Sequence, residues 1–210
     1  MKFNDPDRII TIQWDDSVES GTVLFTLSEN PGIGVEAALD GEVRDAKGNT
    51  LSFCVPFTGF NERVPVLRIN ELRTGYSKPK VEYLELMVMT DGNLGGVEIQ
   101  NTMNSAETYY EFPFCEVRAG DYVVWHLRSL EEGLVDETDN KTVSGGRDSS
   151  PFAWDFWDTQ ERSPLKGTNV LLVRERSGGR IMDALVCAET KYDAWPNDAL
   201  ILAAEEAVSA

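Results

Sequence analysis

The sequence predicts an all-β protein with a β-sandwich in its central and C-terminal parts. Five segments there are rich in the β-branched and aromatic residues that favour strands. Glycine, asparagine and aspartate occur between them, as in the turns that connect strands. Short strands joined by turns are typical of two stacked sheets, and we expect that arrangement here. The five segments are 66–72, 81–86, 120–126, 168–173 and 180–186.

The N-terminal part of the chain has the same strand character. A polar loop at 45–49 separates two of its predicted strands and favours a hairpin. In the strand after this loop Leu51, Phe53 and Val55 alternate with other residues, so they share one face. The predicted strands of this part are 8–14, 22–27, 35–44 and 50–57.

A domain boundary is predicted at residues 59–65, which are polar, contain Gly and Pro, and separate two apolar runs. We therefore expect a small β module at 1–64 and a larger sandwich at 65–190. A module of roughly 60 residues is near the lower size limit for an independent core. In the C-terminal tail, 191–210, Ala, Leu and Glu are frequent between 198 and 208, which predicts a short helix.

The strand that contains Tyr83 has apolar residues on both faces. Leu84, Leu86 and Val88 point one way, whereas Met87 and Met89 point the other way. A half-apolar outer face predicts that another part of the chain covers it. Further strands are predicted at 97–100 and 109–114, and a hairpin turn is predicted around 177–179.

Residues 129–164 depart from the strand pattern and form a long insertion. They begin with acidic and polar residues and continue with a Gly- and Ser-rich stretch at 144–150. An insertion of this length within a compact domain usually carries a function or is flexible. It ends in a cluster of four aromatic residues, Phe152, Trp154, Phe156 and Trp157.

The ordered series of strand motifs resembles the lamin tail domain family. The motifs fall in the order of that family and cover roughly residues 65–190. Each of them alone is a strand with a turn, and their ordered recurrence carries the resemblance. They are Ile69-Asn70-Glu71-Leu72, the segments 81–86 and 92–97, Glu111-Phe112-Pro113, and the segments 117–124, 171–173 and 181–184.

The resemblance implies an immunoglobulin-like β-sandwich. Bacterial domains of this kind look like parts of exported or surface proteins, often beside other immunoglobulin-like modules, and residues 1–64 would suit such a partial neighbour. Two features depart from the family: the insertion at 129–164 is longer than usual, and no coiled-coil heptads precede the domain. The filament role of nuclear lamins is therefore not implied. The resemblance supplies no catalytic residues.

The charge of the chain disfavours nucleic acid as a partner. The formal net charge is −17, from 36 acidic and 19 basic residues, and this field repels phosphate backbones and anionic membrane surfaces. No stretch is long and apolar enough to cross a bilayer, and the N-terminus lacks an apolar signal region. We expect an exported periplasmic or surface protein whose signal lies outside this chain. A cytosolic location is the alternative.

The sequence offers little material for catalysis and predicts no cofactor. His126 is the single histidine, so any Ser-His-Asp or Cys-His arrangement would have to use it. On its strand it is expected opposite the core-facing Val123, Trp125 and Leu127. There is no P-loop, nucleophile elbow or dinucleotide fingerprint. The three cysteines form no C-x-x-C pair, and we expect buried free thiols at Cys54, Cys115 and Cys187.

Two groups of carboxylates have both a functional and a structural interpretation. In the acidic part of the insertion, 136–148, four side chains offer oxygen ligands to calcium, although their spacing is not that of an EF-hand. We favour a solvated loop. Three strand glutamates offer the paired carboxylates that glycoside cleavage requires, but we favour solvent-facing positions for them. The residues are Asp136, Glu137, Asp139 and Asp148 in the loop, and Glu71, Glu82 and Glu85 in the strands.

The aromatic cluster is the main candidate for contact with a partner or ligand. Phe152, Trp154, Phe156 and Trp157 offer rigid apolar area for a protein or a glycan. The structural interpretation, which we favour, is a plug over the sandwich end or over Met87 and Met89. The sequence thus predicts a non-enzymatic structural or protein-interaction module of an exported cell-envelope protein. The alternatives are a carbohydrate- or ligand-binding accessory module and, third, a hydrolase that uses acidic residues.

Overall fold

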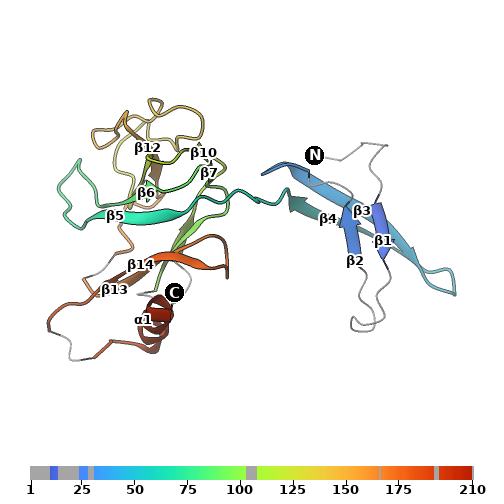
Figure 1. The fold of residues 1–210 in the computed structure, drawn as a ribbon. Coiled ribbons are helices and arrows are strands. Elements are labelled where there is room, and N and C mark those ends of the chain that lie inside the picture. The colour runs from blue at the N-terminus through green and yellow to red at the C-terminus, as the bar shows by residue number, and fades with distance from the viewer. Residues whose placement is uncertain are drawn as a thin grey trace. The chain divides into compact units, whose positions relative to one another are not determined.

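The computed structural model describes residues 10–13, 24–27, 31–102, 108–165, 167–191 and 194–209, and it is all-β apart from one C-terminal helix (Figure 1). The chain divides into two compact units, Met1–Glu62 and Arg63–Ala210. The division falls within the segment 59–65, where we expected a boundary. Each of the predicted strands outside the insertion has a counterpart, shifted by a few residues at its ends.

The described residues of the first unit form two antiparallel two-stranded sheets. In one, β1 (Ile10–Gln13) pairs with β2 (Leu24–Leu27); in the other, β3 (Glu36–Arg44) pairs with β4 (Thr50–Thr58). The predicted strands 8–14 and 22–27 extend in part outside the described residues. At the β3–β4 turn Asp45 Oδ1 accepts the amides of Lys47 and Asn49, each at 2.8 Å. This aspartate turn closes the predicted hairpin.

The expected apolar face of β4 is mostly open. Leu51 is 64% exposed and Val55 is 50% exposed, because in the described part of this unit the β3–β4 sheet has two strands and Ala37 is its one buried apolar side chain. Phe53 instead lies across the ladder over Gly41, its register partner. A Cβ atom at position 41 would come within 2.3 Å of the phenyl ring. A side chain at position 41 would therefore force the ring to move.

The second unit is a sandwich of two four-stranded sheets with a small β7–β10 pair. Sheet I has the order β12-β11-β6-β5 and sheet II has the order β14-β13-β8-β9. Neighbouring strands are antiparallel except β11 and β12, which are parallel. The strands are β5 (Leu67–Arg73), β6 (Tyr83–Val88), β7 (Gly92–Asn93), β8 (Glu98–Asn101), β9 (Thr108–Glu111), β10 (Glu116–Val117), β11 (Tyr122–His126), β12 (Ala153–Trp157), β13 (Asn169–Arg174) and β14 (Ile181–Cys187).

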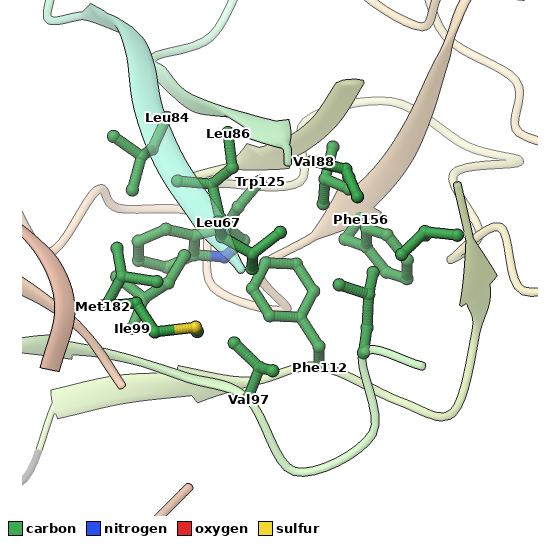
Figure 2. Packing of buried hydrophobic residues seen from close by; sticks show 14 of the residues in the cluster. Leu67, Leu84, Leu86, Val88, Val97, Ile99, Phe112, Trp125, Phe156 and Met182 are labelled. Atoms are coloured by element: carbon green, nitrogen blue, oxygen red, sulfur yellow. The ribbon is translucent and has the colours of Figure 1, made fainter. Parts of the chain in front are cut away.

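The core lies between the inner faces of the two sheets. Leu84 and Leu86 from sheet I meet Ile99 from sheet II, with the Trp125 indole among them, as Figure 2 shows. These positions alternate along their strands, so the period of two in the sequence is the cause of the buried face. Phe112 from the loop after β9 completes this layer with its side chain fully buried.

A hydrogen-bonded seam joins the two sheets along one side. The backbone amide of Ile69 in β5 donates to Asp183 Oδ2 in β14 at 2.8 Å. Beside it, Arg68 Nη1 donates to the carbonyl of Met182 at 2.6 Å. Since β5 and β14 are the outermost strands of their sheets, these contacts occupy backbone groups that would otherwise be open to a further strand.

The C-terminal helix α1 (Asp198–Ser209) packs on β13 and β14. Leu200 and Ala203 of the helix cluster with Val170 and Leu172, which point away from the sandwich core. All side chains of β13 are buried, and its four apolar residues are divided between two layers, with Leu171 and Val173 in the core and Val170 and Leu172 under the helix. This double burial explains the unbroken apolar run in that strand. The helix begins where Asn197 Oδ1 caps the amide of Leu200 at 2.9 Å.

The insertion contains a strand that sequence reasoning did not predict. β12 extends sheet I beside β11, so the aromatic cluster is part of the sheet. The plug interpretation placed the cluster over the sandwich end or over Met87 and Met89. The second of these positions is wrong for β12, because Met87 lies opposite Tyr122 on β6, the other neighbour of β11. The edge of β12 that faces away from β11 is bonded to an earlier part of the insertion. The Glu137 amide donates to the carbonyl of Asp155, and the Asp155 amide donates to Glu137 Oε2, both at 3.0 Å.

The insertion also covers the outer face of sheet I around His126. As predicted, His126 points away from the core that receives Val123, Trp125 and Leu127, yet it is 1% exposed. Its Nε2 atom lies 2.8 Å from Asp155 Oδ1, and its ring stacks on Trp157 with centroids 3.7 Å apart. The histidine is therefore enclosed between the sheet and the insertion.

We predict that Glu137→Ala destabilises the second unit by about 2–4 kcal/mol. The fully buried Glu137 carboxylate accepts the amides of Asp155 and Ser144, and its loss leaves two donors without a partner. Urea unfolding measures the change. The control is Glu132→Ala, an exposed glutamate of the same insertion, which should change stability by less than about 0.5 kcal/mol. Equal effects of the two variants would contradict this account.

Candidate functional site

The four aromatic residues predicted as a contact surface do not share one surface. Phe152 is 82% exposed, Trp154 is half-buried, and Phe156 and Trp157 are buried. The strand geometry of β12 causes this separation, because Trp154 and Phe156 point toward the core and Trp157 points to the outer face. One of the four is thus left mostly open to solvent.

Two members of the cluster are engaged in packing. The Phe156 ring meets Phe112 edge to face, with centroids 5.1 Å apart. The Trp157 indole stacks on His126, and its Nε1 donates to Ser144 Oγ at 2.8 Å. Both contacts attach the insertion to the sandwich. They favour the structural interpretation for these two residues.

Trp154 borders an open cleft of about 590 Å³, the end cleft, at one end of the sandwich. This is the end where β6 finishes and β11 begins. Apart from Trp154, charged side chains dominate its walls, and they come from segments far apart in the sequence. The lining residues are Arg63, Asp91, Gly92, Glu116, Val117, Arg118, Asp121, Lys141 and Trp154.

Asp121 organises the Trp154 side of the end cleft. Its Oδ1 accepts Lys141 Nζ at 2.7 Å, and its Oδ2 accepts Trp154 Nε1 at 3.2 Å and the Arg118 amide at 2.9 Å. The Lys141 ammonium lies 5.0 Å from the centre of the Trp154 ring, within range of a cation–π contact. Three groups from three segments are therefore held by one carboxylate.

The opposite wall is a second charge pair. Arg63 Nη2 donates to Glu116 Oε1 at 2.6 Å, and Asn93 Nδ2 donates to the same oxygen at 2.9 Å. Gly92 lets the chain approach closely here, since a Cβ atom at this position would lie 2.3 Å from the Arg63 carbonyl oxygen. The wall therefore depends on a position without a side chain.

Arg118 gives the end cleft an uncommitted cation. Its side chain is exposed, and within the described part of the chain its guanidinium makes no hydrogen bond or ion pair. The acidic groups beside it are already occupied: Asp91 Oδ1 accepts the Ala119 amide at 2.8 Å, and Glu116 is paired with Arg63. A ligand with an acceptor or a carboxylate can therefore meet Arg118 without displacing an internal partner.

Two carboxylates of the end cleft, Asp121 and Glu116, have lowered pKa values. Partial burial acts to raise the pKa of Asp121, but the hydrogen bonds from Lys141, the Arg118 amide and Trp154 outweigh it, and the net shift is downward. The pKa of Glu116 is lowered by its hydrogen bonds from Arg63 and Asn93. Both groups therefore remain ionised at neutral pH, and the cleft keeps its alternating charges.

Three of the four acidic residues considered for calcium have partners within the chain. Asp136 accepts Trp157 N and Tyr110 Oη, Glu137 is fully buried, and Asp148 accepts the Val81 amide at 2.6 Å. Asp139 is exposed. Among the described residues no group of three or more His, Cys, Asp or Glu side chains is placed to hold a metal ion.

Two of the strand glutamates, Glu71 and Glu85, are register partners on β5 and β6, whereas Glu82 lies apart from them. Glu71 accepts Tyr83 Oη at 2.8 Å and Glu85 accepts Asn70 Nδ2 at 2.6 Å, both on the outer face of sheet I. Glu82 differs from the expected solvent-facing position: it is buried and pairs with Arg128 at 2.6 Å. Burial and the neighbouring Glu71 raise the pKa of Tyr83 to about 12.

The cysteines are free thiols, but the expectation that all three are buried was wrong. Cys115 is buried, Cys187 is intermediate and Cys54 is exposed. Cys54 lies on the β3–β4 ribbon, where the described residues supply no layer to cover it. Burial raises the pKa of Cys115 to about 12, so this thiol is unreactive at neutral pH.

Sequence reasoning identified one side chain of the end cleft, Trp154, and missed its charged walls. The segment Arg118-Ala119-Gly120-Asp121 has the composition of a turn and carries no recognisable binding motif. Arg63 lies in the predicted linker, and Lys141 lies in the acidic loop. No local pattern links these residues, because the fold alone brings them together.

We predict that Phe156→Ala destabilises the second unit by about 3–5 kcal/mol, because the ring fills a core site and its removal leaves a cavity. The matched control is Phe152→Ala, four residues earlier, which should change stability by less than about 0.5 kcal/mol because its ring is 82% exposed. Urea midpoints measure both. A large effect at Phe152 would refute the described placement of the cluster.

We predict that Asp121 stabilises the fold in a pH-dependent manner. Its folded pKa lies below the ordinary value of 3.8, so its contribution is present above pH 3.8 and is lost as the pH falls through the folded pKa. The stability difference between wild type and Asp121→Asn, measured by urea unfolding, should be constant near pH 7 and shrink below pH 3.8. In a Lys141→Met background the shrinkage should be smaller. A difference independent of pH would contradict the assignment.

The described residues contain no helix with the length and apolar character needed to span a membrane.

Comparison with known proteins gives a family for the second unit. An uncharacterised protein of Treponema pallidum (strain Nichols) is 34% identical over 163 residues, which is 77% of this chain. The match covers 42% of that protein's length, so the chain spans less than half of this relative. A family model described as a protein second domain, TP_1001_2nd, matches residues 65–210. The match extends from the start of the sandwich through α1, and the chain therefore belongs to the TP_1001_2nd family.

Proposed function

We propose that this chain is a non-catalytic interaction module of a larger exported bacterial protein and that the end cleft holds a polar segment of a partner protein. The observation that carries the proposal is the cleft itself: an open space of about 590 Å³ with an uncommitted Arg118 beside a fixed Trp154. An aromatic ring with nearby charges of both signs suits a peptide segment, since such groups dominate protein interfaces.

The character of the sandwich supports a binding role over a catalytic one. His126 is 1% exposed and enclosed by the insertion, so a substrate cannot reach it without the departure of Trp157. The carboxylates Asp155 and Glu137 are likewise buried and hold backbone amides. The side chains of types often found in active sites therefore have a structural role here, because they hold the insertion in place.

The relationship to lamin tail domains remains part of this proposal. Two facing sheets, with mostly antiparallel strands in the order of the quoted motifs, support an immunoglobulin-like sandwich. The description of the family as a second domain, and the greater length of the Treponema relative, support a place among further modules. A periplasmic or cell-surface role follows from the resemblance rather than from the site.

A glycan is the second candidate occupant of the end cleft. Trp154 offers an indole face, and the neighbouring Asp121 and Glu116 are carboxylates of the kind that bind sugar hydroxyls. However, Lys141 lies over the Trp154 ring and occupies part of the area on which a sugar would stack. This contact favours the protein partner.

The proposal predicts that a displayed peptide library yields sequences that bind the wild-type chain through Arg118. Charge reversal by Arg118→Glu should weaken the selected peptides by about tenfold or more, because it places repulsion where a ligand acceptor lies. The control is Arg162→Glu, an exposed arginine outside the cleft, which should leave affinity unchanged. Isothermal titration measures both variants, with a glycan array in parallel.

Each outcome of this experiment decides between the candidates. Peptide binding that weakens in Arg118→Glu alone supports the proposal. Binding on the glycan array without enrichment of peptides would show that the end cleft binds a glycan, the second candidate. Failure of both libraries, or peptide binding that is indifferent to Arg118→Glu, would sink the assignment of the end cleft.

A further inference from the structure

A second pocket lies at the opposite end of the sandwich from the end cleft. It opens where β5 ends and before β6 begins, whereas the end cleft lies before β5 and after β6. Its volume is about 380 Å³. We call it the Asn169 pocket, and its walls include Leu72, Thr74, Glu82, Leu165, Asn169 and Leu171.

Asn169 is the feature that sets this pocket apart from a packing defect. The residue is 2% exposed, yet both Oδ1 and Nδ2 lack a hydrogen-bond partner. Its backbone is held at the start of β13, in register with Cys187 of β14. Buried side-chain amides in folded proteins nearly always have partners, and an unpaired polar group costs about 1–3 kcal/mol. This donor and acceptor are therefore available to a ligand.

Glu82, which also lines this pocket, has a buried carboxylate oxygen without a partner. It is 7% exposed; its Oε1 accepts Arg128 Nη2 at 2.6 Å, and its Oε2 has no partner. The Arg128 guanidinium is itself held over the Tyr76 ring, 4.2 Å from its centre. The charge of Glu82 is therefore offset by a fixed neighbour, and what remains is a positioned acceptor rather than an unbalanced negative charge.

These groups define the chemistry of a ligand. It must donate to Glu82 and must both donate to and accept from the Asn169 amide, as another amide does in a two-point pair. Leu72, Leu165 and Leu171 require an aliphatic body against them. Among the described residues that line the pocket none has an aromatic ring, which disfavours a stacked sugar.

We propose that the Asn169 pocket binds a neutral amide ligand with an aliphatic side chain, namely the peptide group of an extended segment beside a leucine-like residue. The aliphatic group packs on the three leucines, and the peptide group pairs with Asn169 and Glu82. This site shares no residue with the end cleft, so the inference does not depend on the function proposed for that cleft.

The test is a titration of the 15N-labelled full chain with N-acetyl-L-leucinamide, followed by amide chemical shifts. We expect saturable shifts around Asn169, Glu82 and Leu171. Asn169→Ala should weaken binding by about tenfold, because it removes both amide hydrogen bonds. The control is Asn70→Ala, an exposed asparagine outside the pocket, which should not change the affinity. Dispersed spectra of each variant show that it is folded.

A second measurement does not require a variant at Asn169. Cys187 also lines the pocket, so the bound probe should slow its alkylation by a maleimide, read by peptide mass spectrometry, while Cys54 in the other unit reacts at an unchanged rate. Methyl glucoside and isobutanol serve as comparison probes. Absence of shifts at the pocket, equal binding by Asn169→Ala, or preferential binding of either comparison probe would overturn the proposal.

Discussion

Two fully buried carboxylates, Glu137 and Asp155, hold the insertion on the sandwich, and the shape of the second unit depends on them. A buried carboxylate is tolerated only when its oxygens are hydrogen-bonded. Glu137 receives the amides of Asp155 and Ser144, and Asp155 receives the Ser150 amide and lies against His126. The bonds to Asp155 join the preceding part of the insertion to β12 and β12 to β11, and the Ser144 bond fixes the loop that carries Glu137. These hydrogen bonds thus fix the position of β12, and the position of β12 determines where the rings of Phe156 and Trp157 pack.

The strands that were predicted from the sequence are mostly those with one buried face. Alternation identified β6 and β11, and glycine and aspartate turns separated the strands that follow. β12 escaped detection because Trp154, Phe156 and Trp157 are apolar on both faces, and its one polar residue, Asp155, is buried. A strand covered on both sides has no period of two. Its pairing partner Glu137 lies 18 residues earlier, beyond the range of local patterns.

The candidate sites were less predictable than the fold because neither is a local motif. Arg63, Asp121 and Lys141 meet at the end cleft from three segments, and Glu82 meets Asn169 at the other end across the two sheets. The sequence could rank Trp154 as a contact residue by its type alone. It could not show that Asn169 lacks a partner, since burial without hydrogen bonding is a property of the packed chain.

The positions of both sites follow from how the faces of the sandwich are covered. Helix α1 lies on the outer face of sheet II at β13, and the insertion lies on the outer face of sheet I at His126. The seam between Ile69 and Asp183 occupies one side. Within the described residues, the two ends of the sandwich, where the strands stop, have no such covering layer. Side chains from different strands come together there. Arg118 and Asn169 lie at opposite ends of this kind, so two ligands could be held at once without contact between them.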